Sequence, residues 1–246
     1  MKIERIIHQT CFDKSNIHPD IVENIASLKR LNSGWEYRLY DNADVEKFIL
    51  DNFGSAIYRV FKKINPKYGA AIADFFRYLV IFKHGGVYLD LKSSISRPLE
   101  EVIQPDDTYL LSQWPNKLGE ALQGFGLHQD VHMVPGGEFE QWHIIACKDH
   151  PFLLSVINRM LFNIENYSTV LYGTGYPGAW RTTGPICYTL AIFPLLHKYS
   201  HRIIDSSAVG FDYTIFGRHE HRTILYGRGE GQSRVHYGVL TEPVVI

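Results

Sequence analysis

The stretch PKYGAAIADFFRYLVIFKHGGVYLDLKSSISRP, residues 66–98, decides the fold of this chain. Residues 70–83 contain neither Gly nor Pro, and their apolar side chains recur at helical spacing, which predicts a helix. Gly85 and Gly86 predict its end, because glycine readily adopts the left-handed conformation found after helices. A short apolar run then predicts a buried strand that ends at Asp90. Open α/β sheets bind ligands beyond the carboxyl ends of such strands.

The remaining elements indicate an α/β protein with a mostly parallel central sheet flanked by helices. Strands are predicted at 4–10, 34–40, 108–112, 138–147, 203–205 and 209–212. Helices are predicted at 19–31, 43–53, 56–64, 152–164 and 186–198. The segment 113–132 shows no period and predicts either a substrate-facing loop or a surface excursion. A length of 246 residues fits one domain, residues 1–246.

The composition excludes several classes of partner. A net charge of −1 argues against a nucleic-acid partner. The sequence contains no run of about 20 apolar residues, so we expect no transmembrane segment. The start MKIERIIHQT lacks the apolar core of a signal peptide. The three cysteines, Cys11, Cys147 and Cys187, form no C-x-x-C pair and favour a reducing compartment. We therefore expect a cytoplasmic protein.

Residues 66–98 resemble the core signature of glycosyltransferase family 32, the group of yeast-type initiating mannosyltransferases and bacterial capsular sugar transferases. The family pattern is A-x-x-D-x-x-R-Y-x-x-L-x-x-x-G-G-I/V-Y-x-D-x-D. The matching residues, in order, are Ala71, Asp74, Arg77, Tyr78, Gly85, Gly86, Val87, Tyr88 and Asp90. Lys92 stands where the family has its second aspartate, which makes a DxK variant of the DxD motif. The resemblance implies a GT-A type, Rossmann-like fold.

Shorter segments resemble the same family and imply further substrate contacts. They include the end of the first strand, an A-x-x-x-H-P-F step, a T-G-P turn before a helix and a late H-x-x-x-x-S element. Trp142 stands where the family commonly has Asn, four residues before the Ala of that step, and would offer a stacking face for a sugar; Thr241 takes the Ser position. The substrate-binding residues implied in this way are His8, Gln9, Thr10, Tyr88, Lys92, Trp142, Thr183, Gly184 and Thr241. Two alternatives stay open, since His8 could merely cap a turn and Trp142 could be a buried core residue.

The family's chemistry requires positive charge near the diphosphate of a nucleotide sugar, because negative charge grows on the leaving group. The resemblance implies that Asp90 and His236 hold Mn²⁺ or Mg²⁺, and that Asp74 and Arg77 bind the donor sugar. Asp74 and Arg77 taken alone would be a surface ion pair. Lys92 leaves two outcomes open. It is either a solvated surface residue beside a retained metal, or an ammonium group that replaces part of the metal's charge.

The implied function is transfer of a sugar from a UDP- or GDP-sugar to a saccharide acceptor, with retention of anomeric configuration. The acceptor hydroxyl would attack on the leaving-group face, so no enzyme nucleophile is assigned. Bacterial or viral surface-polysaccharide synthesis, in the cytosol or at the inner membrane face, would suit such an enzyme. One alternative is a nucleotide-sugar or glycan-binding relative without transfer activity. Another is a phosphohydrolase with Asp90 as nucleophile.

Overall fold

The helix and strand predicted within 66–98 are both present, as α3 (Gly69–His84) and β3 (Gly86–Leu89). The computed structural model describes residues 2–217 and 235–246. Gly85 and Gly86 separate the two elements with φ of 66° and 94°. A Cβ atom on Gly86 would lie 2.3 Å from the carbonyl oxygen of Ile6, so only glycine lets β3 approach the neighbouring strand this closely.

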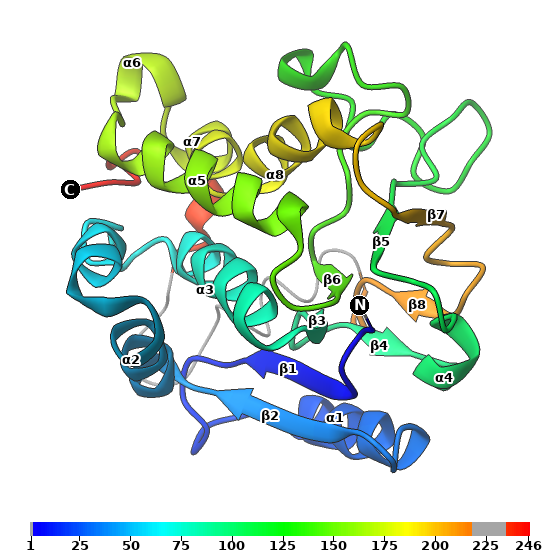
Figure 1. Cartoon of the computed structure of the whole chain (residues 1–246). Helices are drawn as coiled ribbons and strands as arrows, with labels where there is room; N and C mark the ends of the chain where they lie inside the picture. The colour runs from blue at the N-terminus through cyan, green and yellow to red at the C-terminus, as the bar shows by residue number, and fades with distance from the viewer. Residues whose placement is uncertain (1, 218–234) are drawn as a thin grey trace.

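A six-stranded sheet in the order β2-β1-β3-β6-β5-β7 crosses the molecule (Figure 1). Its other strands are β1 (Ile6–Thr10), β2 (Glu36–Tyr40), β5 (Tyr109–Ser112), β6 (His143–Ala146) and β7 (Arg202–Ile204). Only β6 runs against the other strands of this sheet, so the prediction of a mostly parallel sheet is confirmed. A small second sheet pairs β4 (Ser94–Ile95) with β8 (Phe211–Asp212).

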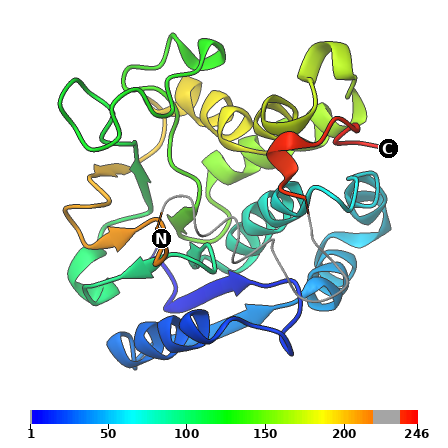
Figure 2. The ribbon, with the colours of Figure 1, turned by 180° about the vertical axis from the view of Figure 1, so that it is seen from behind.

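Helices cover both faces of the sheet (Figures 1 and 2). On one face, α2, α3, α5, α7 and α8 bury a cluster that includes Tyr88 and Ile144. On the other, α1 and α4 bury a cluster that includes Val87, Leu89 and Ile145. Neighbouring residues of a strand point to opposite faces, so each strand serves both clusters. The helices are α1 (Pro19–Leu31), α2 (Asn42–Phe61), α4 (Leu99–Val102), α5 (Pro151–Glu165), α6 (Thr169–Tyr172), α7 (Gly175–Thr182) and α8 (Pro185–Ile192), with single 3₁₀ turns η1 (Gln129–Val131), η2 (Phe193–Leu195) and η3 (Tyr237–Val239).

Three predicted helices differ from those observed. The two helices predicted at 43–53 and 56–64 form α2, which is interrupted at Gly54 with φ of 75°. The helix predicted at 186–198 ends at Ile192, because Pro194 cannot continue the backbone ladder and a 3₁₀ turn follows. The glycine-rich segment before it contains α7, which the composition did not predict. In the described part of the chain, no helix has the length and apolar character needed to cross a membrane.

The reversed direction of β6 creates one polar edge of the sheet. Leu89 at the end of β3 pairs with His143 at the start of β6. The segment entering β6 therefore lies beside the segment leaving β3, and the Asp90 amide donates to the Trp142 carbonyl at 2.8 Å. Residues that follow β3 and residues that precede β6 thus meet at the edge where α/β sheets bind ligands.

Candidate active site

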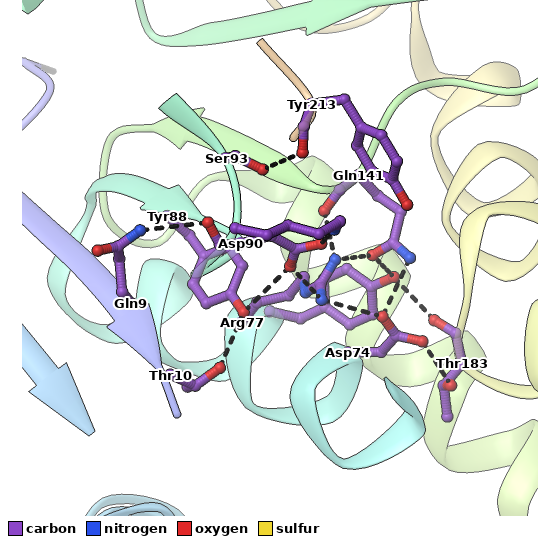
Figure 3. Close-up of polar contacts among 12 residues, drawn as sticks. Gln9, Thr10, Asp74, Arg77, Tyr88, Asp90, Ser93, Gln141, Thr183 and Tyr213 are labelled. Atoms are coloured by element: carbon purple, nitrogen blue, oxygen red, sulfur yellow. Dashed lines mark hydrogen bonds and ion pairs between the residues drawn. The ribbon is translucent and has the colours of Figure 1, made fainter. Parts of the chain in front are cut away.

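Asp90 lies at the centre of the polar cluster at this edge (Figure 3). Arg77 Nη2 donates to Asp90 Oδ1 at 2.9 Å, and Lys92 Nζ donates to Asp90 Oδ2 at 2.7 Å. Burial alone would raise the pKa of Asp90, but the two cations outweigh it and hold that pKa below its usual value. Asp90 is therefore a carboxylate at neutral pH, with a cation on each oxygen.

Arg77 joins three parts of the cluster. Its side chain comes from α3 and is only 5% exposed. Nη1 donates to both the backbone carbonyl and the side-chain Oε1 of Gln141, at 2.7 and 2.8 Å, and the guanidinium carbon lies 4.8 Å from the centre of the Tyr88 ring. Only a guanidinium presents several rigidly arranged donors in this way. Asp74 and Arg77 are thus part of a buried network, and the surface ion-pair alternative is wrong.

Asp74 faces Arg77 one turn earlier on α3. Its Oδ1 lies 3.4 Å from Arg77 Nη2 and accepts from Gln141 Nε2 at 3.0 Å, while Oδ2 accepts from Thr183 Oγ1 at 2.9 Å (Figure 3). Burial raises the pKa of Asp74 above its ordinary value, against the opposing effect of Arg77. The Arg77 guanidinium thus lies between two carboxylates with different environments, which raise the pKa of Asp74 and lower that of Asp90.

Lys92 is also buried, with 7% of the residue exposed. Its ammonium lies 4.0 Å from the centre of the Tyr213 ring, a cation–π distance. The Lys92 carbonyl accepts from the Ile215 amide at 2.9 Å, which fixes the backbone. The interpretation of Lys92 as a solvated surface residue is wrong, because its ammonium is bound between a carboxylate and an aromatic ring.

These four charged side chains line a cavity of about 990 Å³. That volume lies at the upper end of the range for small-molecule sites. Aromatic and polar side chains from distant segments line the same cavity, among them Trp114, Phe125, Glu138, Glu140, Trp180 and Tyr237. Trp114 and Phe125 belong to the irregular segment 113–132, so that segment faces the cavity rather than forming a mere surface excursion.

The polar residues of β1 lie behind the cluster. His8 is fully buried, with Nε2 3.2 Å from the Gly85 carbonyl and Nδ1 3.1 Å from the Tyr40 hydroxyl. Gln9 is also fully buried, and its Nε2 donates to the Asp90 carbonyl at 3.2 Å. The expectation that these two side chains contact substrate is wrong, because protein atoms enclose both. The alternative that His8 caps a turn agrees better with the structure, since its imidazole hydrogen-bonds the carbonyl of Gly85 at the end of α3.

Thr10 and Tyr88 form the next layer behind Arg77. Their hydroxyl oxygens lie 3.0 Å apart, and Tyr88 is 1% exposed beneath the guanidinium. Neither belongs to the cavity wall that the described residues form. Direct substrate contact by the enclosed Tyr88 is therefore a wrong expectation, and its ring instead supports Arg77. Substrate contact by the partly exposed Thr10 stays a prediction.

The later segments contribute unequally. Thr183 is fully buried on Asp74, and a Cβ atom on Gly184 would lie 2.9 Å from the Trp180 Cα, so both residues are packed away from the cavity. Thr241 is exposed and lies outside the lining contributed by residues 2–217 and 235–246. Direct substrate contact by Thr183 and Gly184 is therefore a wrong expectation, since protein atoms enclose both, whereas contact by Thr241 stays a prediction.

Trp142 lines the cavity but is 4% exposed. Its ring packs at 4.2 Å from the His143 ring and 5.7 Å from the Tyr213 ring, centre to centre. The core interpretation of this residue is therefore correct. A stacking face for a sugar at Trp142 stays a prediction.

The described side chains do not fit a divalent cation at Asp90. Both carboxylate oxygens already bind cations, Arg77 and Lys92, which would repel a metal ion. His236 lines the same cavity, but its Nδ1 accepts from the Gly238 amide at 3.1 Å and its ring stacks on Tyr237. Across residues 2–217 and 235–246, no three His, Cys, Asp or Glu side chains form a group that could hold a metal ion.

Gln141, which contacts Arg77, Asp74 and the Tyr78 hydroxyl, was not predicted from the sequence. Tyr213, whose ring lies under Lys92, was not predicted either. Neither residue belongs to a recognisable spacing. Gln141 lay inside the strand predicted at 138–147, but β6 begins only at His143, and the role of Gln141 depends on the antiparallel register of β6.

Part of the chain is similar to a known family of proteins. Residues 18–110 match the glycosyltransferase sugar-binding region containing the DXD motif. Two relatives from Schizosaccharomyces pombe are inositol phosphoceramide mannosyltransferase 3, 28% identical over 70% of this chain, and inositol phosphoceramide mannosyltransferase 1, 26% identical over 75% of it. The alignments cover 42% and 50% of those proteins, so the chain spans about half the length of the curated relatives it matches.

Solved structures support the fold independently. The PaToxG glycosyltransferase superimposes with a TM-score of 0.53 at 15% identity, over 80% of this chain and 71% of that one. At that identity the likeness concerns the fold alone, and it agrees with the mixed sheet between two helical layers. The chain is therefore similar to family 32-like glycosyltransferases, through residues 18–110 and the two mannosyltransferases, and it has a GT-A-like α/β fold.

Proposed function

We propose that the protein is a glycosyltransferase that moves a sugar from a nucleoside diphosphate sugar to a hydroxyl group of a saccharide acceptor. One observation carries the proposal: the buried Arg77 pairs with Asp90, whose side chain is 20% exposed, at the wall of a large cavity, with Asp74 and Lys92 beside them. A buried charged network seldom stabilises a fold better than apolar packing would, so its place at a cavity favours a role in binding.

The charges match the two ends of such a donor. Carboxylate oxygens accept from sugar hydroxyls, and cationic groups stabilise the negative charge that grows on the departing diphosphate. Asp74 and Arg77 would hold the sugar, and Lys92 lies on the same cavity wall. The aromatic side chains along the cavity, such as Trp114 and Trp180, offer faces on which an acceptor sugar can pack.

Retention of configuration is part of the proposal. Both oxygens of Asp74 and both of Asp90 accept hydrogen bonds from the protein, which disfavours either carboxylate as a nucleophile. Attack by the acceptor hydroxyl on the leaving-group face requires no enzyme nucleophile. The same saturation of Asp90 disfavours the phosphohydrolase alternative.

Mannose is the first donor sugar to test, because the curated relatives are named mannosyltransferases. We leave the base open between uridine and guanosine. A cytoplasmic site and a role in polysaccharide synthesis complete the proposal, and the three buried free cysteines are compatible with a reducing compartment.

Incubation with UDP- and GDP-sugars, GDP-mannose included, and simple saccharide acceptors tests the transfer. We expect release of a nucleoside diphosphate together with a glycoside whose anomeric configuration, measured by NMR, matches the donor. Asp74→Asn should lose this turnover, whereas the exposed Asp106→Asn should not. If no donor is turned over, with or without divalent ions, the proposal that the protein is a glycosyltransferase is wrong.

A second candidate is a binding protein without transfer activity, and the saturation of Asp90 by Arg77 and Lys92 is the observation that favours it. Such a protein would bind a nucleotide sugar, seen as a rise in melting temperature, yet release no nucleoside diphosphate. Thermal shift and product formation on the same sample therefore separate the two candidates.

A further inference from the structure

Lys92 has an unusual environment for a lysine on a cavity wall. The residue is 7% exposed, its Nζ lies 2.7 Å from Asp90 Oδ2, and the Tyr213 ring covers it at 4.0 Å. Lysine side chains are rarely buried unless they are paired, and fixing this flexible chain costs conformational entropy. The ammonium is thus held at one place on the wall, rather than sampling the solvent.

The four charged side chains of the network carry no net charge. Asp74 and Asp90 supply two negative charges, and Arg77 and Lys92 supply two positive charges. Mg²⁺ and Mn²⁺ bind carboxylate oxygens whose lone pairs are available, but both Asp90 oxygens already accept from a cation. A divalent ion at Asp90 would therefore have to displace Lys92.

We propose that the Lys92 ammonium takes the place of a divalent cation and binds the diphosphate of the donor directly. This inference rests on the proposed function and specifies its donor site. A lysine binds phosphate as a point charge. Asp90 and Tyr213 hold this charge at the cavity wall, so Asp90 is a positioning residue for Lys92. Binding of the nucleoside diphosphate, and turnover of the donor, then need no divalent ion.

The transfer step balances without a metal. The bond between the anomeric carbon and the β-phosphate oxygen breaks, and its electron pair stays on that oxygen. The acceptor oxygen forms the new bond to the anomeric carbon, and its proton passes to the departing diphosphate. Lys92 stabilises the negative charge on the diphosphate as it develops, while its own proton count stays unchanged.

The test measures binding of UDP and GDP by calorimetry in the presence of EDTA and in the presence of Mn²⁺. We expect the protein to bind one of them in EDTA, with an affinity that Mn²⁺ changes less than about twofold. Lys92→Ala should weaken this binding by about tenfold or more, the effect of losing one charge-assisted hydrogen bond, and should leave binding of the free nucleoside unchanged. The exposed Lys83→Ala, from the same segment, is the matched control.

Two further variants keep the result interpretable. Lys92→Arg should restore most of the affinity in EDTA, and a circular dichroism spectrum reports whether each variant is folded. Lys92→Asp should bind the diphosphate only with Mn²⁺, because it supplies a second carboxylate beside Asp90. Binding by the wild type that requires Mn²⁺, or wild-type affinity in folded Lys92→Ala, overturns the inference and leaves the proposed function intact. Failure to bind UDP and GDP under both conditions overturns both.

Discussion

The Arg77 guanidinium, on α3, donates to both carbonyl oxygens of Gln141, which lies 64 residues later at the entrance to β6. Gln141 in turn donates to Asp74, so its amide connects Arg77 to the carboxylate one turn earlier on the same helix. A neutral side chain thereby sets the spacing between two oppositely charged ones.

We expect Gln141→Ala to reduce kcat/KM by about tenfold or more, since Arg77 and Asp74 each lose a hydrogen bond to the amide. Gln141→Glu should reduce it further, because a carboxylate beside Asp74 cannot donate and adds negative charge. Steady-state kinetics measure both effects. The exposed Gln104→Ala is the control, and unchanged kinetics in Gln141→Ala would contradict a positioning role.

Arg77→Lys should behave as a severe substitution although it keeps the charge. A lysine cannot reproduce the simultaneous contacts to Gln141 and Asp90. Arg77→Ala, which leaves two buried carboxylates without their partner, should lower the free energy of unfolding by about 3–5 kcal/mol. Urea denaturation measures the loss. Arg59→Lys, on the exposed side of α2, should change stability little, and an equally small loss in Arg77→Ala would show that the network is weakly coupled.

Asp90 should make stability depend on pH in the acid range. Its folded pKa lies below the unfolded value near 3.8, so its ion pairs contribute fully above that pH. The contribution is lost as pH falls through the folded pKa, where the carboxylate is protonated. The difference in unfolding free energy between wild type and Asp90→Asn should therefore be constant at neutral pH and shrink below about 3.8. Asp106→Asn should show no such trend, and a difference that grows on acidification would have the wrong sign.

His8 should lower the stability of the protein as the pH falls below about 6.5, a higher pH than the one at which Asp90 takes effect. Burial, with Arg38 nearby, lowers the pKa of His8 from 6.5 to about 3. Below pH 6.5 the unfolded chain binds a proton that the folded chain excludes, so stability falls by about 1.4 kcal/mol per pH unit. His8→Gln, which keeps a donor near Gly85, should lose less stability between pH 6.5 and 4.

The same variant tests whether His8 contacts substrate. Because its imidazole is enclosed by protein atoms, His8→Gln should bind UDP or GDP as the wild type does. The exposed His132→Gln controls for both the denaturation and the binding measurement. A selective loss of nucleotide affinity in His8→Gln would instead support direct contact between His8 and the substrate.

Local patterns were sufficient for much of the fold. The helical spacing from 70 to 83, the Gly85-Gly86 pair and the apolar run before Asp90 predicted α3, the break and β3, because each depends on neighbours within a few residues. The same patterning did not predict that α3 is buried on every side from Asp74 to Ile81. That burial comes from helices and strands distant in sequence, which pack against it from several sides.

By itself, the sequence determined the α/β class, the resemblance to a glycosyltransferase family, and the placement of Asp74 and Arg77 on one helix and of Asp90 at the end of the strand that follows. Only the tertiary structure decided how these charges are satisfied. The antiparallel register of β6 delivers Gln141 to Arg77, and the approach of Tyr213 encloses the Lys92 ammonium. The physical reason is that a helix or turn is specified by residues a few positions apart, whereas the partners of a buried charge are set by which distant segments pack together.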